Sequence, residues 1–429
     1  MEVHKFGGTS VSSEEGLRTL EASAASGNVL VVSALAGVTD ALERFLHDAC
    51  RGAADPDPII DRHERFIAEH LEEDHREVHE FLRQMRTILE GVAPVLEQLE
   101  RPEDRLRDLV LSLGERASAR LIAAYLRERG IPARAYDAWE LGLITNDRPG
   151  NADIIRWEGT RSKLLRDLRA GRIPVVTGFI GRSERGHITT LGRGGSDYTA
   201  TILAGILGTR ALIWTDVDGI MTTDPDLTEA RVVERLSYDE AMMAGASGAE
   251  VIHPKAVEAA KNLEVKILIG NSHTATVGTL ISEKTEPGPK VVAAREDVAL
   301  IQITGARMMD EPGVIGAVTT RLGDHDVNIL ALLTTASEPR INILIEEGEV
   351  DRAREALRHL DYECKVREDV GLVTVVGEGM SHQDVSTFLA SCPGFELLGS
   401  AYGAVAVSVA VPREHTSRTA RALAEALLG

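Results

Sequence analysis

Two glycine-rich segments of the chain carry the residue types that handle phosphate and amino acids. Residues 190–197 read TLGRGGSD, and residues 5–10 read KFGGTS. Glycines let backbone N–H groups approach an anion closely, and a following helix presents its positive N-terminal end. Arg193 can hold a carboxylate through two parallel hydrogen bonds, whereas Asp197 can orient an ammonium group or a catalytic lysine. Together the two segments predict a site that binds phosphate and an amino acid.

Length, composition and charge narrow the classes of protein to which the chain can belong. It has 429 residues, of which 43% are hydrophobic and 27% charged, as is usual for a globular protein with two or three domains. The formal net charge of −20 argues against nucleic acid or an anionic membrane as a partner, because both need a basic surface. An anionic substrate must therefore be bound by local lysine and arginine side chains.

Cysteine usage and the N-terminal residues indicate the compartment. The three cysteines, Cys50, Cys364 and Cys392, are odd in number and far apart, so we expect no disulfide framework and a reducing environment. The N-terminus is predicted to be a strand entering a glycine turn rather than a signal peptide, and no apolar run is long enough to span a bilayer. We expect a cytoplasmic protein that does not bind membranes.

Four near-continuous apolar runs, each followed by a polar or glycine-rich turn, lie in the first two thirds of the chain. These runs cover residues 29–33, 173–177, 211–215 and 265–269. Apolar strands that alternate with helices are typical of a parallel sheet covered on both faces. In such sheets ligands bind beyond the carboxyl ends of the strands, which is where the polar turns fall.

Residues 59–127 are strongly charged and have a helical period, so we predict an inserted helical segment there. His75 and His79 lie one helical turn apart within it. A zinc site is one interpretation of this pair. No zinc motif accompanies it, and we favour a solvated helix face.

The C-terminal part of the chain contains an internal repeat. Residues 283–290 read EKTEPGPK and indicate a linker between domains. Beyond it we predict a β-α-β-β-α-β module and a second, less regular copy, an arrangement common in paired binding modules. The first has strands at 298–304, 327–332 and 340–346 and helices at 312–324 and 351–360. The second has strands at 372–376, 395–398 and 404–411 and helices at 382–390 and 413–428.

Six motifs in order along the chain make it resemble the aspartate kinases. These motifs are KFGGTS at residues 5–10, Ser33 with GVTD at 37–40, LGER at 113–116, GFIG at 178–181, the glycine-rich segment through Asp197, and WTDVDG at 214–219. The resemblance implies an α/β protein: an amino-acid-kinase domain, which is a carbamate-kinase-like three-layer sandwich with a mostly parallel sheet, followed by two ferredoxin-like ACT domains. The domains are predicted at residues 1–285, 291–366 and 367–429.

The resemblance also implies an activity. An aspartate kinase transfers the γ-phosphoryl group of ATP, bound with Mg²⁺, to the side-chain carboxylate of L-aspartate and gives 4-phospho-L-aspartate. This is the first step toward lysine, threonine and methionine. The acceptor is already an anion, so the enzyme must align two negative groups and stabilise charge rather than supply a strong base. Mg²⁺ would be held mainly by the ATP phosphates, because no metal-ligand motif is present.

The resemblance assigns roles to particular residues. The catalytic residues would be Lys5, Arg193 and Asp197. Substrate contacts would come from Ser33, Thr39, Glu115, Arg193, Gly194, Gly195 and Ser196, with Glu115 facing the substrate ammonium. Nucleotide contacts would come from Lys5, Phe6, Gly7, Gly8, Thr215, Asp216, Met221, Asp224 and Lys255. Effector contacts would come from Met309, Gly313, Val314, Ile315, Asp326, Asn328, Ile329, Ser337 and Glu338.

Several residues depart from the family pattern. Glu250 stands where a lysine is usual, Asp226 where an arginine is usual, and Met221 where an aromatic residue often lies. Glu250 and Asp226 either point into solvent or alter nucleotide preference and turnover. In the second ACT module, residues 399–403 replace the usual polar strand end.

These departures leave two alternatives to an aspartate kinase. One is a kinase for another acidic amino acid, although Glu115 argues against an acylated amine. The other is a catalytically weak regulatory subunit that senses amino acids. We expect feedback inhibition by lysine or threonine, and a homodimer or higher oligomer formed through the ACT domains.

Overall fold

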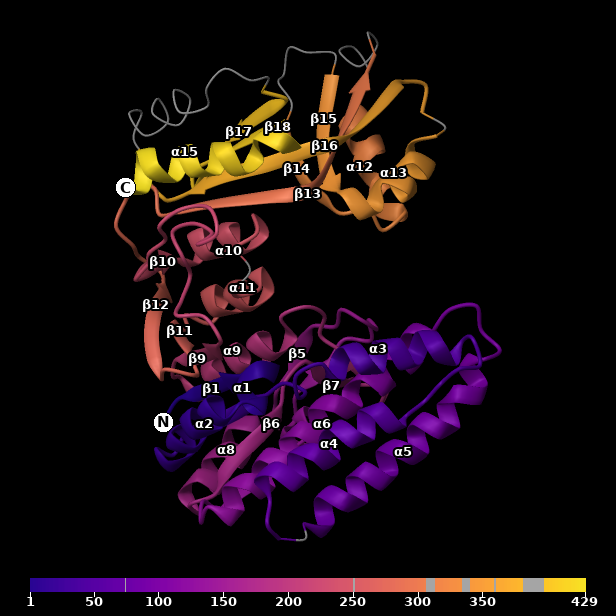
Figure 1. The fold of residues 1–429 in the computed structure, drawn as a ribbon, viewed down its shortest axis with the longest axis vertical. Coiled ribbons are helices and arrows are strands. Elements are labelled where there is room, and N and C mark those ends of the chain that lie inside the picture. The colour runs from indigo at the N-terminus through magenta and orange to yellow at the C-terminus, as the bar shows by residue number, and fades with distance from the viewer. Residues whose placement is uncertain (74, 250, 306–312, 334–339, 359, 381–396) are drawn as a thin grey trace. The chain divides into compact units, whose positions relative to one another are not determined.

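A computed structural model describes residues 1–429 except 74, 250, 306–312, 334–339, 359 and 381–396 (Figure 1). The chain divides into two compact units. The first consists of Met1–Ile220, Glu234–Tyr238 and Val251–Glu283; the second consists of Met221–Val233, Asp239–Glu250 and Lys284–Gly429. None of the described helices combines the length and the apolar character needed to cross a bilayer.

The first unit is built on an eight-stranded sheet with the order β10-β12-β11-β9-β1-β2-β6-β3. All neighbouring strands in it are parallel except β11 and β12. The strands are β1 (Val3–Phe6), β2 (Val29–Val32), β3 (Ala133–Tyr136), β6 (Ile173–Thr177), β9 (Ala211–Thr215), β10 (Arg235–Ser237), β11 (Ile267–Asn271) and β12 (Thr276–Ser282). Strands β2 and β6 are buried along their whole length, because helices cover both faces of the sheet.

The four predicted strands of this unit are β2, β6, β9 and β11. Strand β11 begins two residues later than expected. The chain before it is still completing the turn after a helix, since Glu264 has a φ of 55° and the Val265 N–H donates to the Ala260 carbonyl. A smaller sheet has the order β5-β4-β7-β8 and consists of β4 (Ile144–Thr145), β5 (Ile154–Arg156), β7 (Ile180–Ser183) and β8 (Ile188–Thr190).

Ten helices lie in the part of this unit that the structure describes, and an eleventh, α10, begins at its Tyr238 and continues in the second unit. They are α1 (Gly8–Ser12), α2 (Glu14–Ala25), α3 (Val38–Ala49), α4 (Asp57–His70), α5 (Arg76–Leu96), α6 (Asp104–Glu128), α7 (Ala138–Leu141), α8 (Thr160–Arg169), α9 (Gly195–Leu207), α10 (Tyr238–Ala246) and α11 (Pro254–Asn262). The region predicted as an inserted helical segment falls on α4, α5 and α6. His75 precedes α5 and its ring bonds Glu128 at 2.6 Å, and among the described residues no three histidine, cysteine or acidic side chains gather as metal ligands.

The second unit contains a six-stranded sheet with the order β14-β15-β13-β16-β18-β17, antiparallel throughout. Its strands are β13 (Val291–Thr304), β14 (Ile329–Leu332), β15 (Arg340–Glu346), β16 (Glu363–Val376), β17 (Gly399–Tyr402) and β18 (Ala406–Pro412). Figure 1 shows helices α12 (Val314–Asp324), α13 (Val350–Leu357) and α15 (Thr416–Leu428) against this sheet; short 3₁₀ turns at Glu347–Glu349 and Arg413–His415 precede the last two.

The long strands β13 and β16 pair along their lengths and contribute to two cores covered by helices, and to a third cluster around Leu300 and Leu372. The second half of β13 packs with α12 and α13 around Ile301 and Ile343. Its first half, through Val292, packs with β18 and α15 around Val409 and Leu423. A register shift between Arg295 and Val298 lies where the two halves meet.

One predicted strand of the second module is wrong in position. Residues 397–398 are outside any strand, and the edge strand β17 occupies Gly399–Tyr402 instead. Packing explains the glycine at position 399, since a Cβ there would lie 2.8 Å from a Leu333 methyl. The expected helix at 382–390 lies outside the described residues.

Candidate active site

The ends of strands β1 and β2 bring two of the predicted motifs together. The strands are parallel neighbours with Phe6 opposite Val32, so the turns that follow them start side by side. The Ser33 N–H donates to the Phe6 carbonyl at 3.1 Å. A Cβ on Gly8 would lie 3.0 Å from the Ala34 carbonyl oxygen, which explains why a glycine is present at this close approach.

A cavity of about 290 Å³ opens beyond these strand ends. It is lined by Lys5, Ser33, Thr39, Glu115, Phe179 and residues 192–197. All the residues predicted to bind the substrate therefore lie around one cavity, although they come from three distant parts of the sequence. Its size suits a small polar ligand.

Lys5 supplies a cation at this cavity. It lies on β1, and its Nζ forms an ion pair with Asp197 Oδ1 at 2.8 Å; the two side chains are only 12% and 10% exposed. Asp197 stands in the first turn of α9, where a negative charge is favoured by the helix dipole. Such a partly buried pair fixes the ammonium group in position, while its remaining N–H donors can face a ligand.

Glu115 supplies a buried carboxylate from the middle of α6. It is 3% exposed, and its Oε1 accepts a hydrogen bond from the Ala34 N–H at 3.3 Å. Its Oε2 has no hydrogen-bond partner among the described residues. Burial raises the pKa of Glu115 to about 8, because the protein offers the charged form too little compensation. A cation placed beside this oxygen would stabilise the ionised form.

The glycine-rich turn between β8 and α9 is shaped by contacts that exclude other residues. Gly192 and Gly194 have φ values of 78° and 70°, which L-residues with side chains rarely adopt. A Cβ on Gly194 would also lie 2.1 Å from the Cβ of His253. Beyond the turn, Ser196 is bonded to Ser33 at 3.0 Å, and Arg193 is exposed at the cavity.

Two family models match the chain, and together they cover most of it. The model of the amino acid kinase family matches residues 1–271, and a model of the ACT domain matches residues 301–360. Aspartokinase 3, chloroplastic, from Arabidopsis thaliana is 33% identical over 397 residues, which are 87% of this chain and 69% of the relative. The chain belongs to the aspartokinase family.

Solved aspartokinase structures agree with this assignment along the full length. The structure of E. coli aspartokinase III in complex with aspartate and ADP, in the R-state, has a TM-score of 0.83 and 26% sequence identity, and the match covers 100% of both chains. The T-state of the same enzyme in complex with lysine and aspartate has a TM-score of 0.76 at 28% identity, again over 100% of both chains. The predicted fold class is confirmed.

The expected nucleotide residues of this aspartokinase are less closely grouped than the substrate residues. Phe6 is fully buried and stacks on Trp214 at a ring distance of 6.1 Å, so only its backbone is open to a ligand. Gly7 and Gly8 begin α1 directly after it. Thr215 ends β9, which pairs with β1, and its Oγ1 accepts from the Val217 N–H at 3.1 Å.

Lys255 uses its ammonium group inside the protein. Its Nζ bonds the Ala152 carbonyl at 2.7 Å, the Leu191 carbonyl at 3.0 Å and the Asn151 side chain at 3.2 Å. It also pairs with Asp153 at 3.1 Å. Lys255 thus joins two loops, and its role as a nucleotide contact stays a prediction.

Met221, Asp224 and Asp226, which were expected on the nucleotide side, belong to the second unit. Met221 forms an isolated bridge with Val232, and the Asp224 side chain accepts from the Asp226 N–H at 2.9 Å in a local turn. Asp226 is exposed. Asp216, in the first unit, is also exposed, and Glu250 lies outside the described residues.

The expected effector residues fall at two ends of one helix. Gly313, with a φ of 86°, precedes α12, whose first residues are Val314 and Ile315. Asp326 and Asn328 follow the other end of this 11-residue helix, which is about 16 Å long. Ile329 begins β14. Within one chain the structure does not bring these two groups together, and Met309, Ser337 and Glu338 lie outside the described residues.

Two residues at the cavity were not among the predicted site residues. Phe179 has a φ of 63°, unusual for a bulky residue, and lies against Gly195, whose Cβ would be 3.0 Å from its Cα. Gly192 belongs to the glycine-rich turn itself. The signal for Phe179 was present in the sequence, since the GFIG motif at residues 178–181 had been identified without a role for its aromatic residue.

Proposed function

We propose that this aspartokinase transfers the γ-phosphoryl group of ATP to the side-chain carboxylate of L-aspartate. One observation carries the proposal: the cavity presents the Lys5 ammonium group and the buried, incompletely bonded carboxylate of Glu115. A ligand that satisfies both must have an ammonium group and a negative group. An acidic amino acid held beside a phosphate has this pattern.

In the proposed reaction an aspartate carboxylate oxygen forms a bond to the γ-phosphorus, and the bond from that phosphorus to the bridging oxygen of ADP breaks. The acceptor is already ionised, so no side chain has to remove a proton. Lys5 neutralises charge on the transferring group, and Asp197 keeps Lys5 in place. Glu115 binds the substrate ammonium, and Arg193, with residues 194–196, binds a carboxylate.

For the nucleotide we propose contacts from the glycine turn after β1 and from Thr215 and Asp216 after β9. The parallel pairing of β1 with β9 supports this, because it sets both strand ends at the same edge of the sheet. Mg²⁺ would accompany the triphosphate and be coordinated mainly by its oxygens. The E. coli relative was crystallised with ADP and aspartate, which agrees with a nucleotide beside the amino acid.

For the second unit we propose feedback control by an amino acid, lysine or threonine. The match to an ACT domain and the E. coli T-state structure with lysine support this. We also propose a homodimer or a higher oligomer through this unit, whose strands β14 and β17 are the two edges of its sheet. We keep the predicted domains 1–285, 291–366 and 367–429, with one modification: the packing of Val292 in the second core supports assigning 291–295 to the second ACT module.

The test is ADP release from MgATP with L-aspartate, L-glutamate or N-acetyl-L-glutamate as acceptor. Of the three acceptors, we expect only L-aspartate to give turnover. This turnover should be lost in Lys5→Ala and kept in Lys163→Ala. Lys163 is a suitable control, since it lies on α8 outside the cavity. Turnover with L-glutamate or N-acetyl-L-glutamate would contradict the proposal. So would a folded protein that shows no turnover with any of the three acceptors. Added L-lysine or L-threonine should then lower the aspartate-dependent rate.

A further inference from the structure

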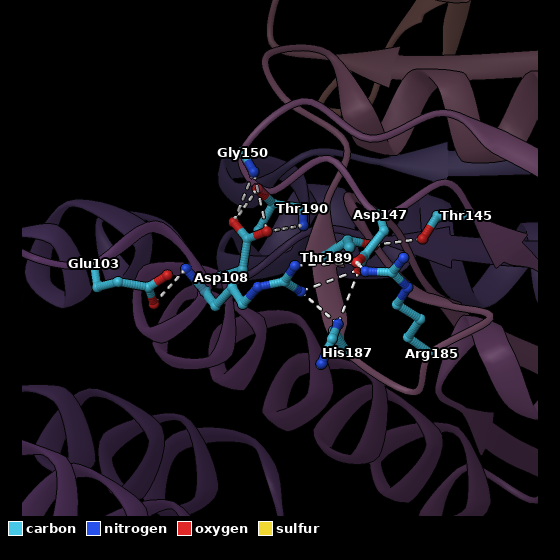
Figure 2. A network of polar contacts seen from close by, with 10 residues as sticks. Glu103, Asp108, Thr145, Asp147, Gly150, Arg185, His187, Thr189 and Thr190 are labelled. Carbon is cyan, nitrogen blue, oxygen red and sulfur yellow. Dashed lines mark hydrogen bonds and ion pairs between the residues drawn. The ribbon is translucent and has the colours of Figure 1, made fainter.

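A second buried carboxylate on α6 lies outside the cavity. Asp108 is fully buried, and its hydrogen-bond partners are Gly150, in the loop between β4 and β5, and Thr190, where the glycine-rich turn begins (Figure 2). The Gly150 N–H donates to its two oxygens at 3.1 and 3.0 Å, the Thr190 N–H donates at 3.0 Å, and the Thr190 hydroxyl donates at 2.7 Å. Unlike Glu115, Asp108 therefore has both oxygens bonded by the protein.

The two loops held by Asp108 support the glycine-rich turn. Thr190 is the last residue of β8, three positions before Arg193. The Ala152 N–H donates to the Thr190 carbonyl at 2.9 Å and joins the loops. Gly192 lies on the other loop so closely that a Cβ would be 2.9 Å from the Asn151 side-chain oxygen. The position of Arg193 thus depends on where Asp108 holds these loops.

A second set of contacts joins the first turn of α6 to the same two segments of the chain. Arg105 donates two hydrogen bonds to Asp147, at 3.1 and 3.0 Å. His187, on the hairpin between β7 and β8, bonds Asp147 at 2.9 Å (Figure 2). Arg105 and His187 hold the pKa of Asp147 far below its usual range, so this anchor stays ionised. Helix α6 is therefore fixed to both loops at two points.

Asp108 and Glu115 are seven residues apart on α6, which is about two turns and places them on one face roughly 10 Å apart. We infer that Asp108 is a positioning residue for substrate recognition: through Thr190 and Gly150 it ties the turn of Arg193 to the helix that carries Glu115. The helix then sets the spacing between the carboxylate-binding and the ammonium-binding groups. The inference rests on the proposed function, because the proposed function assigns the substrate carboxylate to Arg193 and the substrate ammonium to Glu115.

The test compares Asp108→Asn with Asp167→Asn. Asp167 is also fully buried and accepts hydrogen bonds from Tyr136 and Arg172, but it lies on α8 and outside the cavity. In Asp108→Asn one oxygen becomes an NH₂ group facing N–H donors, so we expect the KM for aspartate to rise about tenfold. The KM for ATP should stay within about twofold, because the predicted nucleotide residues Gly7, Gly8, Thr215 and Asp216 follow β1 and β9 rather than these loops. Lys255, which these loops do hold, keeps its bonds to the Ala152 and Leu191 carbonyls in the variant. Asp167→Asn should lower the melting temperature and leave both KM values unchanged.

A second variant keeps the inference testable if Asp108→Asn fails to fold. Thr190→Val removes only the 2.7 Å hydroxyl contact and keeps the side-chain shape. We expect it to raise the KM for aspartate about threefold, again without a change in the KM for ATP. Equal changes in both KM values, or none, in the folded variant would overturn the inference. A folded wild-type protein without aspartate-dependent turnover would instead overturn the proposed function.

Discussion

Replacing Glu115 with glutamine should make the protein more stable at alkaline pH and poorer at binding aspartate. Burial raises the pKa of Glu115 from 4.5 to about 8. Between these values the folded protein holds a proton that the unfolded chain has released. Raising the pH therefore favours unfolding, and the free energy of unfolding falls across this window. A difference of about 3.5 pKa units corresponds to about 5 kcal/mol, reached above pH 8.

Glutamine has nearly the same shape and no charge, so Glu115→Gln should lose this pH dependence. At pH 5 the two proteins should unfold at similar temperatures. At pH 9 the variant should melt roughly 10 °C higher, since 1 kcal/mol shifts the midpoint of a domain of this size by at least about 2 °C. The measurement is thermal unfolding of both proteins from pH 5 to 9, compared as a difference so that every other titrating group cancels.

Aspartate binding should change in the opposite sense. In the proposed site the substrate ammonium pairs with the ionised carboxylate of Glu115. At pH 7 only about a tenth of a group with a pKa of about 8 is ionised. The dissociation constant of the wild type should therefore fall about tenfold as the pH rises from 7 to 9, with release of a proton that calorimetry in two buffers detects. The variant should bind weakly and without proton release. Identical pH profiles for the two proteins, in stability or in binding, would refute this reasoning.

Two further predictions concern the glycine turn and the second unit. Gly194→Ala places a Cβ 2.1 Å from that of His253 at a φ of 70°, so this variant should lose most of its turnover and unfold at a lower temperature. The control is Gly208→Ala, at a φ of 69° with no atom near the added Cβ, which should lower the free energy of unfolding by about 1 kcal/mol and keep the activity. Lys290→Met removes the ammonium partner of the fully buried Glu240, which also accepts from the Glu378 N–H, and calorimetry should show the second unit destabilised by about 3–5 kcal/mol. Adding Glu240→Met should restore part of this stability. If it restores none, the lost packing of Lys290 and not the unpaired charge of Glu240 is responsible.

The parts of the site that lie directly after strands could be predicted from the sequence. Lys5 and Arg193 lie in short glycine-rich segments at strand ends. There the local sequence pattern predicts both a tight turn of the backbone and its place at the edge of the sheet. Glu115 needed the family resemblance, because a glutamate within a helix is an ordinary sequence feature. Its burial depends on α3 and β2, which are far away in the sequence.

Residues whose partners are scattered along the chain could not be predicted in their roles. The nucleotide contact expected of Lys255 stays a prediction. Its bonds to the carbonyls of Ala152 and Leu191 could not be foreseen, because they depend on how three segments fold together. The same holds for β13: the charged residues 295–297 interrupt its apolar pattern, yet pairing with β16 continues on both sides of them. Local patterns report hydrophobic faces and turns, whereas long strands and buried cations depend on distant partners.

The two buried carboxylates of α6, Asp108 and Glu115, differ in how many of their oxygens the protein itself bonds. Asp108 and Glu115 lie on the same helix at similar depth, and burial raises the pKa of both. Four contacts from backbone and hydroxyl donors satisfy Asp108, so its cost of burial is offset within the folded chain. Glu115 keeps one oxygen without a partner among the described residues, so its cost is offset only when a cation binds. In the proposed site the stability lost at Glu115 is recovered as binding energy for the substrate ammonium. By the same proposal the fully bonded Asp108 keeps the turn of Arg193, the second recognition group, at the distance that this substrate requires.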